Sequence, residues 1–282
     1  MFDVEKRTVE ELIARYEFEP GLRDIYVEGE FDSDLLTASQ AKNANEQYIY
    51  SIGTVDIPAA LLQSYSLTSG NKQRVLALAK ELNRNLEGNF QYLCLTDRDL
   101  DFWFQGLEDI RNHKWTEFSS IELHFFNPDF LRHYLFTVCR TKISCFESFL
   151  SSFTGILSMA FALRCVDREL GLNLSWLALE KCLHKCTNQV IRFDLEDYIS
   201  RTLNKNGMHS ELDRFNKSYK IWITKLVGDP RQHIRGHDFV HLLSWTVKTF
   251  SGVKDVSTET AVYRMFINSA LNDTNISAEI AA

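Results

Sequence analysis

The sequence predicts an α/β domain with a mainly parallel sheet, followed by an all-helical C-terminal half. Short apolar runs of β type alternate with segments of helical spacing up to Pro128. After Pro128 the apolar residues recur at helical spacing, and glycines separate the segments. Two of the β-type runs also end in carboxylates, as at the ligand-binding edge of an open parallel sheet. We therefore expect an α/β domain over residues 1–140 and a helical domain over residues 141–282.

The elements of the first half are expected in a regular order. Thr8 and Glu11 have the spacing of a capping box and predict the start of the first helix. Asp32 or Ser33 can cap the next helix, and a later segment carries an apolar stripe at helical spacing. The expected helices cover residues 8–16, 32 to about 43, and 71–86. The expected strands cover residues 24–28, 47–52, 90–96 and 120–126.

The second half is expected to contain helices alone. Gly171, Gly207 and Gly228 separate its periodic segments. The polar C-terminal residues 272–282 are expected to fray. The expected helices cover residues 129–139, 146–170, 175–203, 210–226 and 239–250.

Composition predicts a soluble cytoplasmic protein. The 31 basic and 38 acidic side chains give a net charge of −7, so nucleic-acid binding would depend on local basic patches and metal ions. Six cysteines without a Cys-x-x-Cys pair indicate reduced core thiols in a cytosolic protein. The uncharged run Ser148–Leu163 is too short to span a bilayer, which favours a core or dimer-interface helix.

Carboxylates gather after two of the expected strands. The first cluster follows the strand that ends at Glu28, and the second contains Asp97 and Asp99. If the second strand continues, these two aspartates lie two residues apart on one face. Close carboxylates repel by roughly 4 kcal/mol per pair at a surface-like dielectric, so a cluster requires protons or cations. The oxygen ligands suit Mg²⁺ or Mn²⁺, whereas the alternative is that these are ordinary solvated acids.

These motifs carry a resemblance to a known family. The sequence Val27-Glu28-Gly29-Glu30-Phe31-Asp32, followed by Asp97-Arg98-Asp99, resembles the Toprim domain of primases, topoisomerases and OLD-type nucleases. Residues 51–56 and 70–74 are similar to small bacterial Toprim nucleases paired with an ATPase, among them the effector of the PARIS anti-phage system. The resemblance implies a Rossmann-like Toprim catalytic domain and a helical domain for dimerisation, substrate or partner contacts.

The resemblance also implies roles for individual carboxylates. Glu28 would act as a general acid/base or organise the metal, while Asp97 and Asp99 would bind the metal directly. Asp32 would be a further ligand, or only a helix cap. Glu122, in the fourth expected strand, stands roughly where OLD-like nucleases have an acid for a second metal.

Two basic segments are candidates for substrate binding. Lys72 and Arg74 lie at an expected helix start, where they could hold a phosphate, although a solvated helix turn explains them equally. Arg235 and His237 belong to the most basic stretch of the chain, which precedes another expected helix. They could contact substrate phosphates, or serve only as loop and cap residues.

The function implied by the resemblance is that of a Mg²⁺-dependent endonuclease acting as a toxic effector in anti-phage defence. Its implied substrate is RNA, specifically tRNA, and its implied state is a homodimer. A nearby-encoded ATPase of the AAA or ABC type would restrain it until infection. The sequence has no Gly-x-x-x-x-Gly-Lys-Ser/Thr motif, so ATP would be handled by that partner. The alternative is a non-catalytic Toprim-based module that docks on an ATPase, and a primase-like enzyme is a third interpretation.

Overall fold

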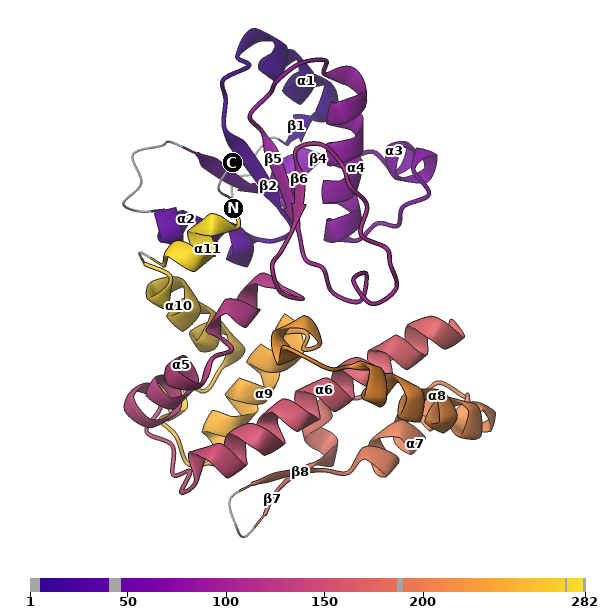
Figure 1. Ribbon diagram of the computed structural model, residues 1–282, viewed down its shortest axis with the longest axis vertical. Coiled ribbons are helices and arrows are strands. Elements are labelled where there is room, and N and C mark those ends of the chain that lie inside the picture. Colours follow the sequence, from indigo (N-terminus) through magenta and orange to yellow (C-terminus); the bar gives the residue numbers. More distant parts are fainter. Residues whose placement is uncertain (1–5, 41–46, 187–189, 272, 281–282) are drawn as a thin grey trace. The chain divides into compact units, whose positions relative to one another are not determined.

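The chain forms two compact units (Figure 1). The computed structural model describes residues 6–40, 47–186, 190–271 and 273–280. Unit 1 comprises the chain up to Ile121 together with the segment from Arg264 onwards, and unit 2 comprises residues 122–263. The division therefore falls earlier than the expected boundary at residue 140, and the C-terminal segment returns to the first unit.

Unit 1 is built on a four-stranded parallel sheet. Its spatial order is β3 (Tyr48–Ser51), β2 (Asp24–Val27), β5 (Leu93–Thr96) and β6 (His113–Trp115). All three neighbouring pairs are parallel, with Tyr26 opposite Tyr50 on one side and Cys94 on the other. A separate parallel pair joins β1 (Arg7–Thr8) to β4 (Val55–Asp56). The mainly parallel sheet expected from the sequence is therefore confirmed.

The expected fourth strand at residues 120–126 is wrong. Residues Ile121–Phe125 form a short 3₁₀ helix, η2, and the fourth strand is β6. The apolar alternation of Ile121, Leu123 and Phe125 resembles a strand, but nearly all of this segment is buried. The Ile121 N–H donates to the Asp97 side chain at 3.2 Å instead of pairing with a strand.

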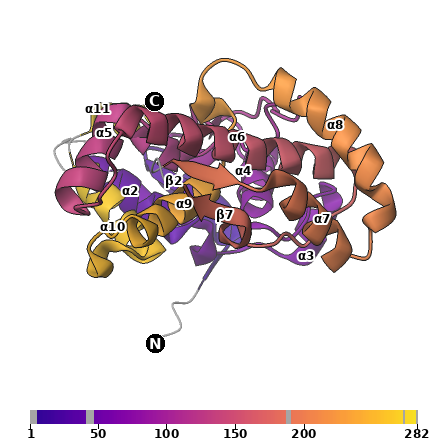
Figure 2. The ribbon, with the colours of Figure 1, turned by 90° about the horizontal axis from the view of Figure 1, so that it is seen from below.

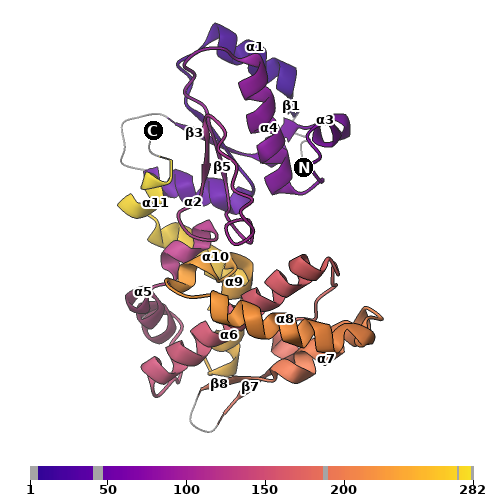
Figure 3. The same cartoon turned by 45° about the vertical axis from the view of Figure 1, so that its right-hand side comes forward.

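The helices of unit 1 cover both faces of the sheet (Figure 3). The chain passes from β2 through α2 (Glu30–Gln40) to β3, then through α3 (Ala59–Ser64) and α4 (Asn71–Asn85) to β5 on the far side of β2. Right-handed crossovers in opposite directions place α2 and α4 on opposite faces. In Figure 3, α4 lies beside α1 (Val9–Phe18), and α2 lies beside α11 (Thr274–Ala278).

Local signals set the helix starts of unit 1. The capping box before α1 is confirmed, because Thr8 Oγ1 accepts from the Glu11 N–H at 3.2 Å and Glu11 accepts from the Thr8 N–H at 2.7 Å. The second helix begins at Glu30, earlier than expected. Its expected end near residue 43 lies outside the described residues.

The core of unit 1 lies under α4. The buried face of this helix includes Val75, Leu78 and Leu82, which belong to one apolar cluster with Tyr26 and Cys94 of the sheet. Each fully buried aliphatic side chain contributes about 1.5–3 kcal/mol relative to an exposed one. This packing joins α4 to the sheet.

Unit 2 is mainly helical. Figure 2 shows α6 as its long central helix, and α7 and α8 lie near one end of it. The two closest helical partners of α6 are α8 and α9. The helices are α5 (Pro128–Arg132), continued by a π-helical turn at His133–Val138, α6 (Phe146–Leu170), α7 (Leu195–Lys205), α8 (Leu212–Lys225), α9 (Gly236–Thr249) and the start of α10 (Glu259–Ser269).

The expected helix at residues 175–203 is largely wrong. An antiparallel hairpin of β7 (Leu183–Lys185) and β8 (Ile191–Phe193) occupies much of it, although residues 187–189 lie outside the described chain. Asp194 accepts a hydrogen bond from the Asp197 N–H at 3.3 Å and caps α7, which fixes where the helix begins. The second half is therefore predominantly helical, with one small sheet.

Among the helices of the described residues, α6 alone has the length and composition of a membrane span. Its most apolar window has a mean hydropathy of 1.6, and 56% of that window is buried inside the protein. Phe149, Phe153 and Leu157 are almost fully buried. The helix therefore serves as the core of unit 2, which is consistent with a soluble protein.

Candidate functional site

The topology of unit 1 places a crevice at the carboxyl ends of β2 and β5. The chain leaves β2 toward β3 on one side, whereas the next crossover brings it to β5 on the other side. Ligands of open α/β sheets bind outside the carboxyl ends of the strands at such a reversal. Glu28 follows β2 directly, and Asp97 follows β5 directly. The two acidic clusters singled out by the sequence thus meet at this edge.

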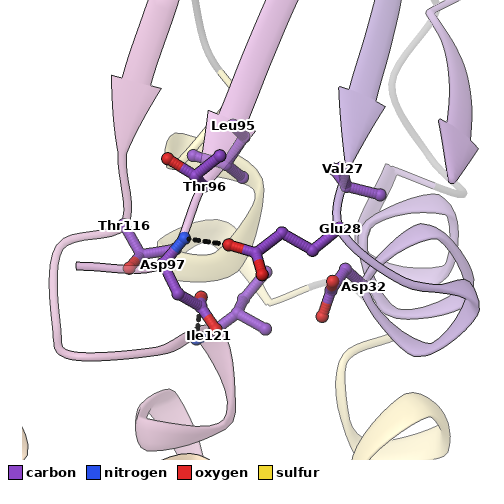
Figure 4. Close-up of a pocket in the computed structure, with 8 residues that line it drawn as sticks. All are labelled: Val27, Glu28, Asp32, Leu95, Thr96, Asp97, Thr116 and Ile121. Atoms are coloured by element: carbon purple, nitrogen blue, oxygen red, sulfur yellow. Dashed lines mark hydrogen bonds between the residues drawn. The ribbon is translucent and has the colours of Figure 1, made fainter. Parts of the chain in front are cut away.

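A small pocket lies at this point (Figure 4). Three carboxylates reach it from three elements: Glu28 from the end of β2, Asp32 from the first turn of α2 and Asp97 from the end of β5. The pocket is lined by Val27, Glu28, Asp32, Leu95, Thr96, Asp97, Thr116 and Ile121. Apolar residues therefore form part of the wall of a carboxylate-bearing pocket.

Backbone hydrogen bonds hold two of these carboxylates. Glu28 Oε1 accepts from the Asp97 N–H at 3.0 Å, and Asp97 Oδ1 accepts from the Ile121 N–H at 3.2 Å. Figure 4 shows the Glu28 side chain reaching from β2 toward the backbone of Asp97. Hydrogen bonds to an ionised carboxylate are stronger than neutral ones, so they hold these oxygens at the pocket.

Asp32 both caps its helix and lines the pocket. Its Oδ2 accepts from the Gly29 N–H at 2.9 Å, in the manner of the acidic residue of a capping box. The capping alternative is thus observed, and the same carboxylate also borders the pocket.

Asp99 does not share a strand face with Asp97. Strand β5 ends at Thr96, and Asp99 has a positive φ of 43°, in the left-handed region. The i and i+2 geometry holds only for an extended strand, so that expectation is wrong. Asp99 instead accepts from the Lys72 ammonium, at 3.3 Å.

The Lys72 ammonium is surrounded by oxygen atoms near the pocket. Its Nζ is 2.6 Å from Asp101 Oδ2 and 3.3 Å from Asp99 Oδ2, and its side chain is only 13% exposed. Burial acts to lower the pKa of Lys72, but the negative charges of Asp99 and Asp101, and more weakly that of Glu28, outweigh it and raise the pKa. The side chain is therefore a charged ammonium at neutral pH.

Arg74, the other expected phosphate ligand of this region, contacts the backbone. Its Nη2 donates to the carbonyl oxygens of Ile52 at 3.2 Å and Val55 at 2.8 Å. These bonds join α4 to Ile52, which follows β3, and to Val55 of β4. Their geometry indicates a structural role for the guanidinium group.

The remaining expected site residues belong to unit 2. Glu122 lies in η2 and is buried, so its expected place in a strand is wrong. Arg235 precedes α9 and lies 3.7 Å from Asp238 Oδ2, a residue of the first turn of that helix. His237 is exposed on the same turn. The loop-and-cap alternative thus describes the observed contacts of Arg235.

Sequence reasoning missed two residues of this edge. Thr116 lines the pocket, accepts from the Arg98 N–H at 3.3 Å and donates to the Phe118 carbonyl at 2.8 Å. It follows β6, whose short polar sequence has no apolar periodicity to mark it. Asp101, two residues beyond Asp99, forms the closest contact of Lys72.

The donors in the pocket fit a hard divalent cation. Three carboxylates border it together with Thr96 and Thr116, and its described lining residues include no histidine or cysteine. Such oxygen donors suit Mg²⁺ or Mn²⁺. Among the described residues, the oxygens of Glu28, Asp32 and Asp97 do not all lie within 4.8 Å of one another.

The fold and the pocket define the class of this protein as a doubly wound α/β unit with a carboxylate pocket at its switch point, joined in one chain to a helical unit. No protein-family model matches the chain, and no curated protein matches it either. The function is therefore inferred from the residues of the pocket.

Proposed function

We propose that this protein is a Toprim-type endonuclease that depends on Mg²⁺ or Mn²⁺ and hydrolyses phosphodiester bonds. The observation that carries the proposal is the meeting of Glu28 and Asp97 at the carboxyl ends of adjacent parallel strands. The motif resemblance places a catalytic glutamate and a metal-binding aspartate at these two positions. The switch-point location supports a ligand site on independent topological grounds.

In this proposal the three pocket carboxylates have distinct tasks. Asp97 and Asp32 hold the ion, and Glu28 transfers a proton or helps to organise the metal. The bound ion would polarise the scissile phosphate and lower the pKa of the attacking water. The backbone donors at Asp97, Gly29 and Ile121 keep the carboxylates oriented before substrate arrives.

The resemblance also implies a substrate, a biological role and a partner for the proposed nuclease. The substrate would be RNA, specifically tRNA, and the protein would act in the cytoplasm as a toxic effector of anti-phage defence. It would work as a homodimer released from a partner ATPase of the AAA or ABC type. The net charge of −7 supports a substrate contact that depends on metal ions more than on a basic surface.

The test is cleavage of tRNA by the purified protein with Mg²⁺. Glu28→Gln should lower the cleavage rate by about 10²-fold or more, which is the usual contribution of a positioned proton-transfer group. The matched control is Glu87→Gln, because Glu87 is an exposed carboxylate that does not line the pocket. Full activity of the Glu28→Gln protein would refute the proposal.

The second candidate is a non-catalytic module that docks on an ATPase. One observation favours it: Lys72 already neutralises part of the acidic edge by pairing with Asp99 and Asp101. This candidate predicts a complex with the ATPase that is unaffected by Asp97→Asn. It also predicts no cleavage and no Mn²⁺ binding by the wild-type protein.

A further inference from the structure

The acids at the edge of unit 1 fall into two groups. Glu28, Asp32 and Asp97 line the pocket after β2 and β5. Asp99 and Asp101 lie further along the same loop, and both contact the ammonium group of Lys72. The turn at Asp99, with its positive φ, lies between the two groups and follows the end of β5 at Thr96. The two aspartates of the Asp-x-Asp motif thus have different surroundings, because Asp97 lines the pocket and Asp99 contacts Lys72.

The ammonium of Lys72 uses its full hydrogen-bonding capacity inside the protein. An ammonium has three donors. Three oxygens surround Nζ: Asp101 Oδ2 at 2.6 Å, Asp99 Oδ2 at 3.3 Å and the Arg98 carbonyl at 3.5 Å. The Trp115 ring lies 5.4 Å from Nζ and covers it further. A group held in this way is poorly placed to bind a substrate phosphate, which was its expected role.

The position of Lys72 in the fold also fixes it. It is the second residue of α4, and the buried face of this helix packs against the sheet. The backbone of Lys72 is therefore held at this edge. Its charge also interacts with that of Glu28 in the pocket. The positively charged ammonium group of Lys72 therefore lies beside the proposed metal pocket.

We propose that the Lys72 ammonium takes the place of a second divalent cation at this edge, so that the protein binds a single catalytic ion. This inference rests on the proposed metal-dependent function. Asp99 and Asp101 have the oxygen donors for another ion, but an ion there would have to displace the ammonium or be repelled by it. Lys72 is thus a positioning residue that sets the number of metal ions.

The test is the stoichiometry of Mn²⁺ binding to the full chain, measured by electron paramagnetic resonance of free Mn²⁺ during titration. The wild-type protein should bind one ion per chain. Lys72→Met keeps the apolar stem but removes the charge, and should create a second site, for two ions per chain. Lys72→Arg retains the charge and should bind one ion. No activity measurement is needed.

Lys80→Met is the matched control. Lys80 lies on the same helix, is 21% exposed and pairs with Glu108 at 2.7 Å, but its partner is not at the metal edge. This variant should bind one ion, like the wild-type protein. Circular dichroism would confirm that each variant is folded.

The outcomes separate this inference from the proposed function. Two ions in the wild-type protein would overturn the inference and leave the proposed metal-dependent function standing. A folded Lys72→Met protein that still binds one ion would also overturn it. No ion in the wild-type protein would overturn the proposed function, and the inference with it. Where Lys72→Met fails to fold, Lys72→Gln, which also removes the charge, is titrated in its place, and the same two results support or overturn the inference.

Discussion

At the scale of the residue, the surroundings of each carboxylate decide what it can do. Asp97 and Asp99 are separated by a single residue, yet one lines the pocket and the other pairs with Lys72. The cause is backbone conformation, because the left-handed turn at Asp99 redirects its side chain. Two aspartates of the same side-chain chemistry therefore have different proposed roles.

A first prediction concerns His113 at the start of β6. Its Nε2 is 2.8 Å from Thr96 Oγ1, and burial lowers the pKa of His113 to about 4 from an ordinary value of 6.5. Because the folded-state pKa is depressed, the neutral ring contributes stability that is complete above pH 6.5 and is lost as the pH falls toward 4. We expect a loss of roughly 3 kcal/mol in the free energy of unfolding across this window.

Urea unfolding at several pH values between 7 and 4 would measure this effect. His113→Gln removes the titrating ring, so the stability of this variant should depend less on pH than that of the wild-type protein. Parallel pH profiles for the two proteins would contradict the assignment.

At the scale of the element, close packing limits which residues can follow a helix. After α9, Gly252 donates its N–H to the Val247 carbonyl at 2.8 Å. A Cβ atom at Gly252 would lie 2.7 Å from Val247 Cγ1 and 3.0 Å from the Cys139 carbonyl oxygen. The end of α9 therefore requires a residue without a side chain.

A second prediction follows for two glycines of unit 2. Gly252→Ala should reduce the free energy of unfolding by about 1–3 kcal/mol, because the backbone or Val247 must move. Gly155→Ala is the matched control, since a Cβ there meets nothing within 4 Å in the middle of α6, and alanine should stabilise that helix by about 0.5–1 kcal/mol. Thermal unfolding of both variants would test this, and equal shifts would contradict it.

At the scale of the whole molecule, the segment from Arg264 onwards returns to the unit formed by the first part of the chain. Helix α11 packs on α2, and its Ile276 is fully buried. The Glu279 carboxylate accepts from the Glu117 N–H at 2.9 Å, which further ties the C-terminal segment to unit 1. The expected fraying of this end is wrong for residues 273–280, because its two isoleucines are buried.

A third prediction is that the C-terminal segment stabilises the unit that carries the pocket. Ile276→Ala should lower the free energy of unfolding of unit 1 by about 2–5 kcal/mol and increase hydrogen exchange in α2. Ile221→Ala serves as the control, because Ile221 is 54% exposed and its truncation should change stability by less than about 0.5 kcal/mol. Unchanged exchange in α2 of the Ile276→Ala protein would contradict the role of this segment.

The sequence by itself determined the features that depend on neighbouring residues. Apolar runs located β2, β3 and β5, periodicity located α4 and α6, and the spacing of Thr8 and Glu11 located a helix start. The position of Glu28 and Asp97 after two β-type runs also led to the edge where they meet. These signals are local, because they arise from side-chain alternation and from hydrogen bonds within one turn.

Only the tertiary structure decided the features that depend on distant partners. The pairing of β6 with β5, the pairing of Lys72 with Asp99 and Asp101, and the return of α11 to unit 1 each join segments well separated in the sequence. The 3₁₀ helix at Ile121–Phe125 likewise depends on a hydrogen bond from Ile121 to Asp97. Apolar periodicity reports whether a segment is buried, but it does not report which remote hydrogen-bond or charge partner the fold brings to it.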